Sequence, residues 1–125
     1  MDDLVQWLGK QYDEDEEIAQ AVHGPSDKQW WVAEDIKTRL CDDQIWMADA
    51  SFIAAHGPAR VLREIDAKRQ ILRALQNAEV ALRNTEPGKE SHELMRGSTN
   101  SLRATVRMLA TAYADRPGYR EEWRP

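Results

Sequence analysis

The sequence has a single cysteine, Cys41, among its 125 residues. A disulfide within the chain is therefore excluded, and a lone thiol suits a reducing compartment. No run approaches the ~18 consecutive apolar residues that a membrane-spanning helix needs. The start, MDDLVQWLGK, also lacks the basic residues and the apolar stretch of a signal peptide. We therefore expect a cytoplasmic protein that does not engage a membrane.

Patterns that hold metals or activate nucleophiles are missing as well. The three histidines and Cys41 show no His-x-x-x-His or Cys-x-x-Cys spacing. The six glycines are scattered singly, so there is no glycine-rich phosphate loop. Two aspartates follow Cys41, and their charge disfavours a reactive thiolate. We expect no catalytic residue, no metal site and no cofactor, and hence a protein that is not an enzyme.

The sequence does contain enough apolar residues for a core, and its charge is divided unevenly. Hydrophobic residues make up 42% and charged residues 31%, which predicts one globular domain over residues 1–125. Residues 1–57 carry 4 basic and 13 acidic side chains, a net of −9, whereas residues 58–125 carry 13 and 9, a net of +4. The two halves either balance each other inside the fold or form surfaces for different partners.

Hydrophobic spacing predicts an acidic helix over residues 1–23. Apolar residues recur at steps of four from Leu4 to Tyr12, and Ile18 and Val22 resume the stripe. The DEDEE run in the middle of this helix places like charges one turn apart, which destabilises it locally. We therefore expect a basic side chain near this run.

Two long amphipathic helices are predicted over residues 58–84 and 90–114. Pro58 is well placed as the first residue of the earlier helix, because its missing N–H needs no partner there. A short helical turn over Ser51–Ala55 precedes it. Because only a short turn separates the two long helices, we expect them to pack antiparallel.

The stretch over residues 28–49 has two interpretations. Apolar and polar residues alternate around Trp30 and again around Trp46, and this alternation with aromatic enrichment favours a β-hairpin. Apolar residues at steps of four from Val32 to Leu40 favour a helix instead. We favour the hairpin. The predicted fold class is therefore mainly α with a small β-hairpin (α+β), built on an antiparallel pair of long helices plus an N-terminal helix.

The C-terminal tail, residues 115–125, is unusually aromatic for a chain end. Tyr119 and Trp123 lie four residues apart, after a turn favoured by Pro117-Gly118. Burying each ring contributes on the order of 2 kcal/mol. We expect the tail to dock on the two long helices, and presentation to a partner is the alternative, because aromatic and arginine residues dominate interface hot spots.

Arginines recur one turn apart on both long helices. They are Arg60, Arg63, Arg69, Arg73, Arg103 and Arg107. Together they could engage phosphates, although solvated faces or pairing with the acidic run also account for them. A pI near 5.2 argues against nonspecific nucleic-acid binding. The acidic half raises a further alternative, a surface that imitates DNA and inhibits a basic partner.

Several stretches carry a resemblance to a known group of proteins. They are AAHGPARVLREIDAKRQIL, the terminal YADRPGYREEWRP, and the start MDDLVQWL followed by DEDE. In these the chain resembles an uncharacterised family, a domain of unknown function, of short actinobacterial and actinobacteriophage proteins. The family's motifs are similar to HDPARVLRE and YADHPxYREEWRP, and Gly57 and Arg116 depart from them. The resemblance implies a bacterial cytosol and a phage or prophage setting, but no activity.

The leading hypothesis is a small cytosolic, non-enzymatic protein-interaction module with a protein partner. A nucleic-acid-associated regulator using the basic helices is the alternative, and homodimerisation is left open because the oppositely charged halves offer surface for it. The candidate interaction residues are His56, Arg60, Arg69, Arg73, Tyr119 and Trp123. We further expect Glu121 and Glu122 of the tail to pair with cations of the 58–84 helix.

Overall fold

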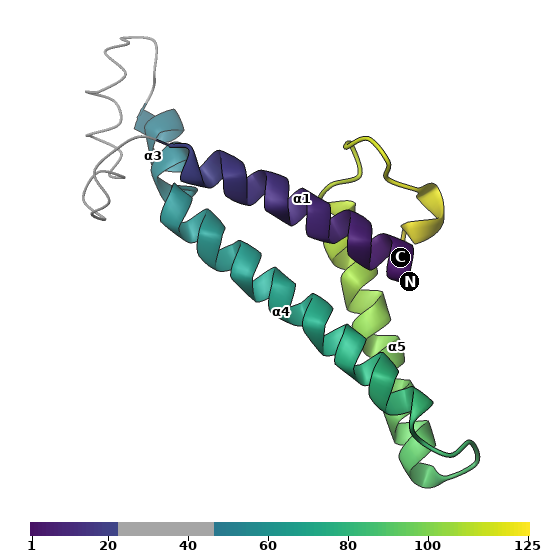
Figure 1. The fold of residues 1–125 in the computed structure, drawn as a ribbon. Coiled ribbons are helices and arrows are strands. Elements are labelled where there is room, and N and C mark those ends of the chain that lie inside the picture. The colour runs from purple at the N-terminus through teal and green to yellow at the C-terminus, as the bar shows by residue number, and fades with distance from the viewer. Residues whose placement is uncertain (23–46) are drawn as a thin grey trace. The chain divides into compact units, whose positions relative to one another are not determined.

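The computed structural model describes residues 1–22 and 47–125 (Figure 1). Within these ranges the chain forms four α-helices, one short 3-10 helix and no β-strand. The elements are α1 (Asp2–Gln20), α3 (Met47–Ala55), α4 (Pro58–Arg83), α5 (Glu90–Thr111) and the 3-10 helix η2 (Glu121–Trp123). The long helices agree closely with the predicted 58–84 and 90–114, and α4 begins at Pro58 as expected.

The predicted α+β class is wrong, because the described residues form helices joined by turns and contain no strand. Residues 47–49, the end of the predicted hairpin, form the first turn of α3. Four of the nine residues of α3 are alanine, the strongest helix former, and Asp49 lies in the first turn, where negative charge suits the helix dipole. Local helix propensity outweighs two residues of strand-like alternation. The rest of that predicted hairpin, residues 28–46, lies outside the described residues.

The chain divides into two compact units. Unit 1 contains Met1–Asp13 and Asp66–Pro125, and unit 2 contains Glu14–Ile65. The prediction of a single domain over residues 1–125 stays a prediction, and each unit is described separately below.

Unit 1 has a core to which three helices contribute. Its large buried side chains include Leu4, Leu8, Tyr12, Leu72, Leu75, Val106 and Tyr113. Leu8, Leu75 and Val106 have no exposed surface at all. Burial of each such side chain contributes about 1.5–3 kcal/mol, so this helical core is the main source of stability in unit 1.

Within unit 1, α4 and α5 pack antiparallel. Lys68 Nζ donates to Tyr113 Oη over 3.4 Å near one end, and Arg103 Nε contacts Glu79 Oε1 at 3.1 Å farther along. The residue number rises along α4 as it falls along α5, which defines the antiparallel direction. Glu79 has a side chain only 12% exposed, so Arg103 supplies the charge that this carboxylate needs.

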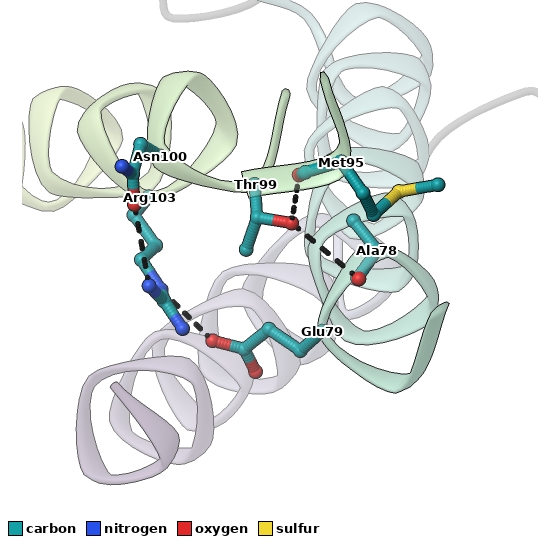
Figure 2. A network of polar contacts seen from close by, with 6 residues as sticks. All are labelled: Ala78, Glu79, Met95, Thr99, Asn100 and Arg103. Atoms are coloured by element: carbon teal, nitrogen blue, oxygen red, sulfur yellow. Dashed lines mark hydrogen bonds and ion pairs between the residues drawn. The ribbon is translucent and has the colours of Figure 1, made fainter. Parts of the chain in front are cut away.

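Thr99 sits where the two helices meet (Figure 2). Its hydroxyl lies 2.8 Å from the Met95 carbonyl on its own helix and 3.4 Å from the Ala78 carbonyl on α4. Thr99 is fully buried, so the hydroxyl needs these acceptors in place of water.

The turn between α4 and α5 is held by side chains. Thr85 donates its hydroxyl proton to the Leu82 carbonyl at 2.7 Å. Because that proton is committed, His92 Nδ1 must be the donor in its 2.8 Å contact with Thr85 Oγ1. Gly88 adopts φ +87°, a left-handed conformation that glycine accepts without strain.

The acidic run of α1 has the basic neighbour that we expected from the sequence. Arg69 Nη2 of α4 lies 2.6 Å from Asp13 Oδ1, and both residues belong to unit 1. The Arg69 side chain is 27% exposed, so the pair is partly shielded from water. This contact joins α1 to α4 and offsets part of the repulsion within the run.

Candidate interaction surface

A groove of about 480 Å³ opens in unit 2, among the last turns of α1, α3 and the start of α4. Its apolar lining consists of Ile18, Ala19, Val22, Phe52, Ile53, Pro58 and Val61. Asp15 and His56 are the polar residues that line it. A groove of this size and lining is typical of sites that hold an apolar ligand or an apolar side-chain group.

The apolar residues reach this groove because the stripe of α1 changes face. Leu4, Leu8 and Tyr12 follow at steps of four and are buried in unit 1. The next apolar residue of that stripe, Ile18, comes six positions after Tyr12, which turns it by about 120° around the helix axis. Ile18 and Val22 were predicted to continue one stripe, but they are 67% and 41% exposed.

His56 and Phe52 form one wall of the groove. Their rings stack, with centroids 4.3 Å apart and planes 24° apart. His56 Nδ1 lies 2.9 Å from the Phe52 carbonyl oxygen, and since a carbonyl only accepts, Nδ1 carries the proton and donates. The imidazole is therefore held in one orientation, and it in turn steadies Phe52, whose side chain is 66% exposed.

Arg60, another candidate residue, joins α3 to α4 beside the groove. Its Nη1 donates to the Ala55 carbonyl at 2.9 Å, at the end of α3, and its Nε donates to Glu64 Oε1 at 2.7 Å. A cation at a helix C-terminus satisfies a carbonyl that lacks an intrahelical partner. Arg60 therefore supports the wall that carries His56 and Phe52.

One carboxylate of the acidic run of α1 reaches the groove. Residues 14–17 are all carboxylates, and residues 14–22 contain no lysine or arginine. Asp15 lines the groove itself. An apolar groove beside an acidic segment favours a ligand that combines apolar groups with positive charge.

The basic candidates of α4 are engaged within unit 1. Arg69 pairs with Asp13, as described above, and Arg73 Nη2 lies 4.0 Å from Asp66 Oδ1. These contacts lower the positive charge that the helix offers to a phosphate. The structure therefore separates the candidates into two groups, with His56 and Arg60 in unit 2 and Arg69 and Arg73 in unit 1.

The aromatic candidates of the tail lie against α1. Trp7 contacts both, with ring centroids 5.8 Å from Tyr119 and 5.4 Å from Trp123. The Tyr119 and Trp123 rings meet edge to face at 6.0 Å, and Trp123 is buried. Such aromatic pairs contribute about 0.5–1.5 kcal/mol beyond the area they bury. Sequence reasoning did not identify Trp7 as the residue these rings contact.

The turn that precedes these rings is fitted to Trp7. The indole Nε1 donates to the Pro117 carbonyl at 3.1 Å. Gly118 adopts φ +86°, and a Cβ added there would lie 2.8 Å from that Nε1. Arg120 Nη1 lies 3.1 Å from Asp3 Oδ2, which brings the two chain ends together, as Figure 1 shows.

The expected pairing of the tail carboxylates with α4 is wrong. Glu121 pairs with Arg124, and Glu122 lies 3.6 Å from Arg120, so both are neutralised within the tail. The hydrogen bond from Arg124 lowers the pKa of the Glu121 carboxyl. Tyr113, which precedes the tail, receives a hydrogen bond from Lys68 of α4.

Two features are absent from the residues that the structure describes. No helix there is both long and apolar enough to cross a membrane. In those same residues, no three His, Cys, Asp or Glu side chains gather into a group that could hold a metal ion.

Comparison with known proteins places the chain in a family. It matches, over residues 1–125, the family described as a family of unknown function (DUF6221), and the chain belongs to that family. No curated protein and no solved structure matches it. The actinobacterial and phage distribution inferred from the motifs stays a prediction.

Proposed function

We propose that this member of the DUF6221 family is a non-enzymatic protein-interaction module that binds a basic amphipathic helix of a partner protein in the groove of unit 2. The motif resemblance supports a bacterial cytosol as the setting, in an actinobacterium or its phage. The carrying observation is the exposed apolar lining of the groove, in which Ile18 and Phe52 are 67% and 66% exposed.

Exposed apolar side chains gathered around one groove favour a binding role. Apolar residues scattered singly over a surface need no explanation, but a contiguous patch in a concave site marks a place where a partner docks. An amphipathic helix presents anchors at i, i+3 or i+4 and i+7, which suits a groove formed between helices. Phe52 is held by its stacking on His56, so part of the surface is ordered before a partner arrives.

Charge defines the chemistry of the partner. Residues 14–17 of α1 are four consecutive carboxylates, and one of them, Asp15, lines the groove. A helix with lysine or arginine beside its apolar stripe complements this acidic run, and such complementarity raises association rates and disfavours acidic competitors. The groove-binding segment is therefore expected to be basic.

The nucleic-acid alternative has less support. Arg69, Arg73 and Arg103 of the predicted basic faces contact Asp13, Asp66 and Glu79. A phosphate would have to displace these carboxylates. The pI of about 5.2 adds general repulsion between the chain and a polyanion.

The proposal is tested by placing a photo-crosslinking p-benzoylphenylalanine at position 52 of the full-length chain and irradiating it in a bacterial lysate. The crosslinked segment of the partner is sequenced, synthesised as a peptide and titrated against the chain. We expect a basic segment with apolar residues at helical spacing, and we expect Val22→Asp to weaken its binding at least about tenfold, or 1.4 kcal/mol.

The matched control is Val80→Asp, since Val80 is the same residue type, is 48% exposed against 41% for Val22, and lies on α4 in unit 1. This variant should leave binding unchanged. Crosslinking only to residues 23–46 of the chain itself would contradict the proposal. An acidic captured segment, or equal losses for the two variants, would also contradict it.

A further inference from the structure

The polar side chains that line the groove of unit 2 accept hydrogen bonds and have no donor to spare. Among the described residues of the lining, these side chains are Asp15 and His56. An ionised carboxylate only accepts, and the single N–H of a neutral His56 is committed to the Phe52 carbonyl, 2.9 Å from Nδ1. Nε2 of the imidazole is therefore an acceptor. A ligand that reaches this polar lining must bring its own donors.

Phe52 adds an aromatic face to the same groove. One face of its ring stacks on His56, with centroids 4.3 Å apart, and Phe52 is nevertheless 66% exposed. The exposure falls on the other face and on the ring edge, because the stacking covers one face. The negative face of an aromatic ring attracts a cation, and a guanidinium can also stack on it. Phe52 is thus a recognition feature independent of the carboxylate.

A guanidinium combines the properties that these side chains select. It is planar and positively charged, with five N–H donors and no acceptor. Its fork of donors matches the two oxygens of a carboxylate, and its plane can lie on an aromatic ring. An ammonium group has the same charge, but it is a compact, strongly hydrated point charge that does not stack. The lining of the groove therefore favours arginine over lysine.

We propose that an arginine of the partner helix enters this groove, with its guanidinium on the exposed face of Phe52, where it donates to Asp15 and to Nε2 of His56. The inference rests on the proposed function and specifies the residue that anchors the partner. The apolar lining holds the aliphatic stem, since such stems lie along apolar surface while the charged head contacts polar groups. Asp15 also has an interaction elsewhere in the chain, but its two oxygens offer about four acceptor sites and can accept a further donor.

The charges next to the groove do not oppose a bound guanidinium. Arg60, which supports the groove wall, pairs with Glu64 at 2.7 Å. Residues 14–22 of the chain contain no lysine or arginine. A cation that approaches along α1 therefore meets the carboxylate of Asp15 without competition from a cation of that segment. Arginine is also enriched among the residues that dominate binding energy at protein interfaces.

The test uses n-octylguanidinium and n-octylurea as matched probes for the full-length chain, below their micelle-forming concentrations. The two share a stem and a planar head, but the urea head is neutral and has an acceptor oxygen. NMR titration of the methyl groups of Ile53 and Val61, which line the groove, reports binding at this site. We expect octylguanidinium to bind at least about tenfold more tightly than octylurea, and at least about threefold more tightly than octylammonium.

Equal affinities for octylguanidinium and octylurea would overturn the inference, because the groove would then bind the apolar stem without reading the head. An octylammonium probe that binds as tightly as octylguanidinium would overturn the preference for arginine. Methyl resonances of Ile53 and Val61 that do not shift with any probe would overturn the location.

Asp15→Asn tests the contact with the carboxylate, because it keeps the shape of the side chain and removes its charge. The preference for octylguanidinium over octylurea should fall to about threefold or less. Glu17→Gln is the matched control, since it removes the same charge from the same run at an exposed residue outside the lining of the groove. It should keep the tenfold preference. Equal losses in the two variants would indicate a distant field in place of a contact, and would overturn the inference.

Phe52→Leu tests the aromatic face, because leucine keeps an apolar side chain without a π system. The affinity for octylguanidinium should fall at least about threefold, while that for octylurea should change less than about twofold. Equal losses for the two probes would overturn the stacking. Circular dichroism melting verifies that all variants stay folded.

The partner segment captured by crosslinking at position 52 separates this inference from the proposed function. Replacing its arginines one at a time by citrulline, which is neutral and has a urea head, should identify one at which binding weakens at least about tenfold, or 1.4 kcal/mol. A captured basic segment whose cations are all lysine would overturn the inference and leave the proposed function standing. An acidic segment would contradict both.

Discussion

Unit 1 and the described part of unit 2 treat their apolar residues differently. Unit 1 buries large side chains from α1, α4, α5 and the tail, including Leu8, Leu75 and Trp123. Among the described residues of unit 2, Ile65 is the large side chain that reaches full burial, while Ile18 and Phe52 stay about two-thirds exposed. Amphipathic helices therefore bury their large apolar side chains in unit 1, whereas in unit 2 they leave some of these side chains exposed.

The difference shows that apolar composition alone does not identify a core. In unit 1, residues more than a hundred positions apart meet, as when Trp7 donates to the Pro117 carbonyl. In unit 2, the described contacts of the groove wall are local, such as the His56 contact with Phe52 four residues earlier. Long-range contacts close the core of unit 1, so substitutions there should cost the most.

The largest effect is expected at Trp123. Removing its ring by Trp123→Ala should lower the free energy of unfolding by about 3 kcal/mol, because the buried ring also packs on Trp7 and Tyr119. Phe52→Ala, the comparison in unit 2, should change it by less than about 0.5 kcal/mol, since Phe52 is largely exposed. Urea unfolding followed by circular dichroism measures both, and similar losses would refute the contrast between the units.

A smaller effect is expected at Gly118, where the cost of backbone strain can be separated from the cost of a steric clash with Trp7. Gly118→Ala places a residue with a Cβ at φ +86° and pushes that Cβ against Trp7 Nε1. Gly88→Ala has a similar strain, at φ +87°, but meets nothing within 4 Å. The strain alone costs about 1 kcal/mol, so we expect about 1 kcal/mol at Gly88 and about 2 kcal/mol at Gly118.

Equilibrium unfolding gives the two energies, and the indole N–H resonance of Trp7 reports its bond to Pro117. That resonance should shift in Gly118→Ala and stay in place in Gly88→Ala. If the two variants lose equal stability, Gly118 does not pack closely against Trp7, and the tail is less tightly packed in unit 1 than the structure indicates.

The smallest effects concern ion pairs. Arg69→Gln breaks a pair that joins residues 56 positions apart in unit 1, and it should cost about 1 kcal/mol, because Arg69 is partly shielded. Glu64→Gln removes the local pair with Arg60 in unit 2, where both side chains are nearly half exposed, and should cost about 0.3 kcal/mol. Thermal unfolding at low and high salt measures both, and an Arg69→Gln variant that melts like the wild type would contradict the assignment.

The spacing of apolar residues predicted which segments are helical, but it did not always predict which side chains are buried. The steps of four from Leu4 to Tyr12 predicted a buried stripe, and these residues are buried. The same reasoning extended that stripe to Ile18, which faces the groove instead. The six-residue interval before Ile18 was the available signal, since at about 100° per residue it turns the side chain onto another face.

Two candidate residues have ring contacts that differ from the expected ones. Tyr119 and Trp123 were expected against the two long helices, and their rings lie on Trp7 of α1. A periodic pattern gives the side of a helix that is buried but not the element that covers it. The prediction that 28–49 contains strands failed at residues 47–49 for a related reason, because two alternating residues carry less information than an alanine-rich helical turn.

Local physical chemistry was sufficient to determine that long helices form, that Pro58 begins one of them and that the acidic run needs a cation. These outcomes depend on interactions between residues one or two helical turns apart, and such residues can be identified directly in the sequence. Tertiary structure alone decided that Arg69 is that cation, that Trp7 receives the tail and that Leu94 and Met108 face solvent. Those outcomes depend on which helix faces end up against each other, and this is settled by packing between residues far apart in the chain.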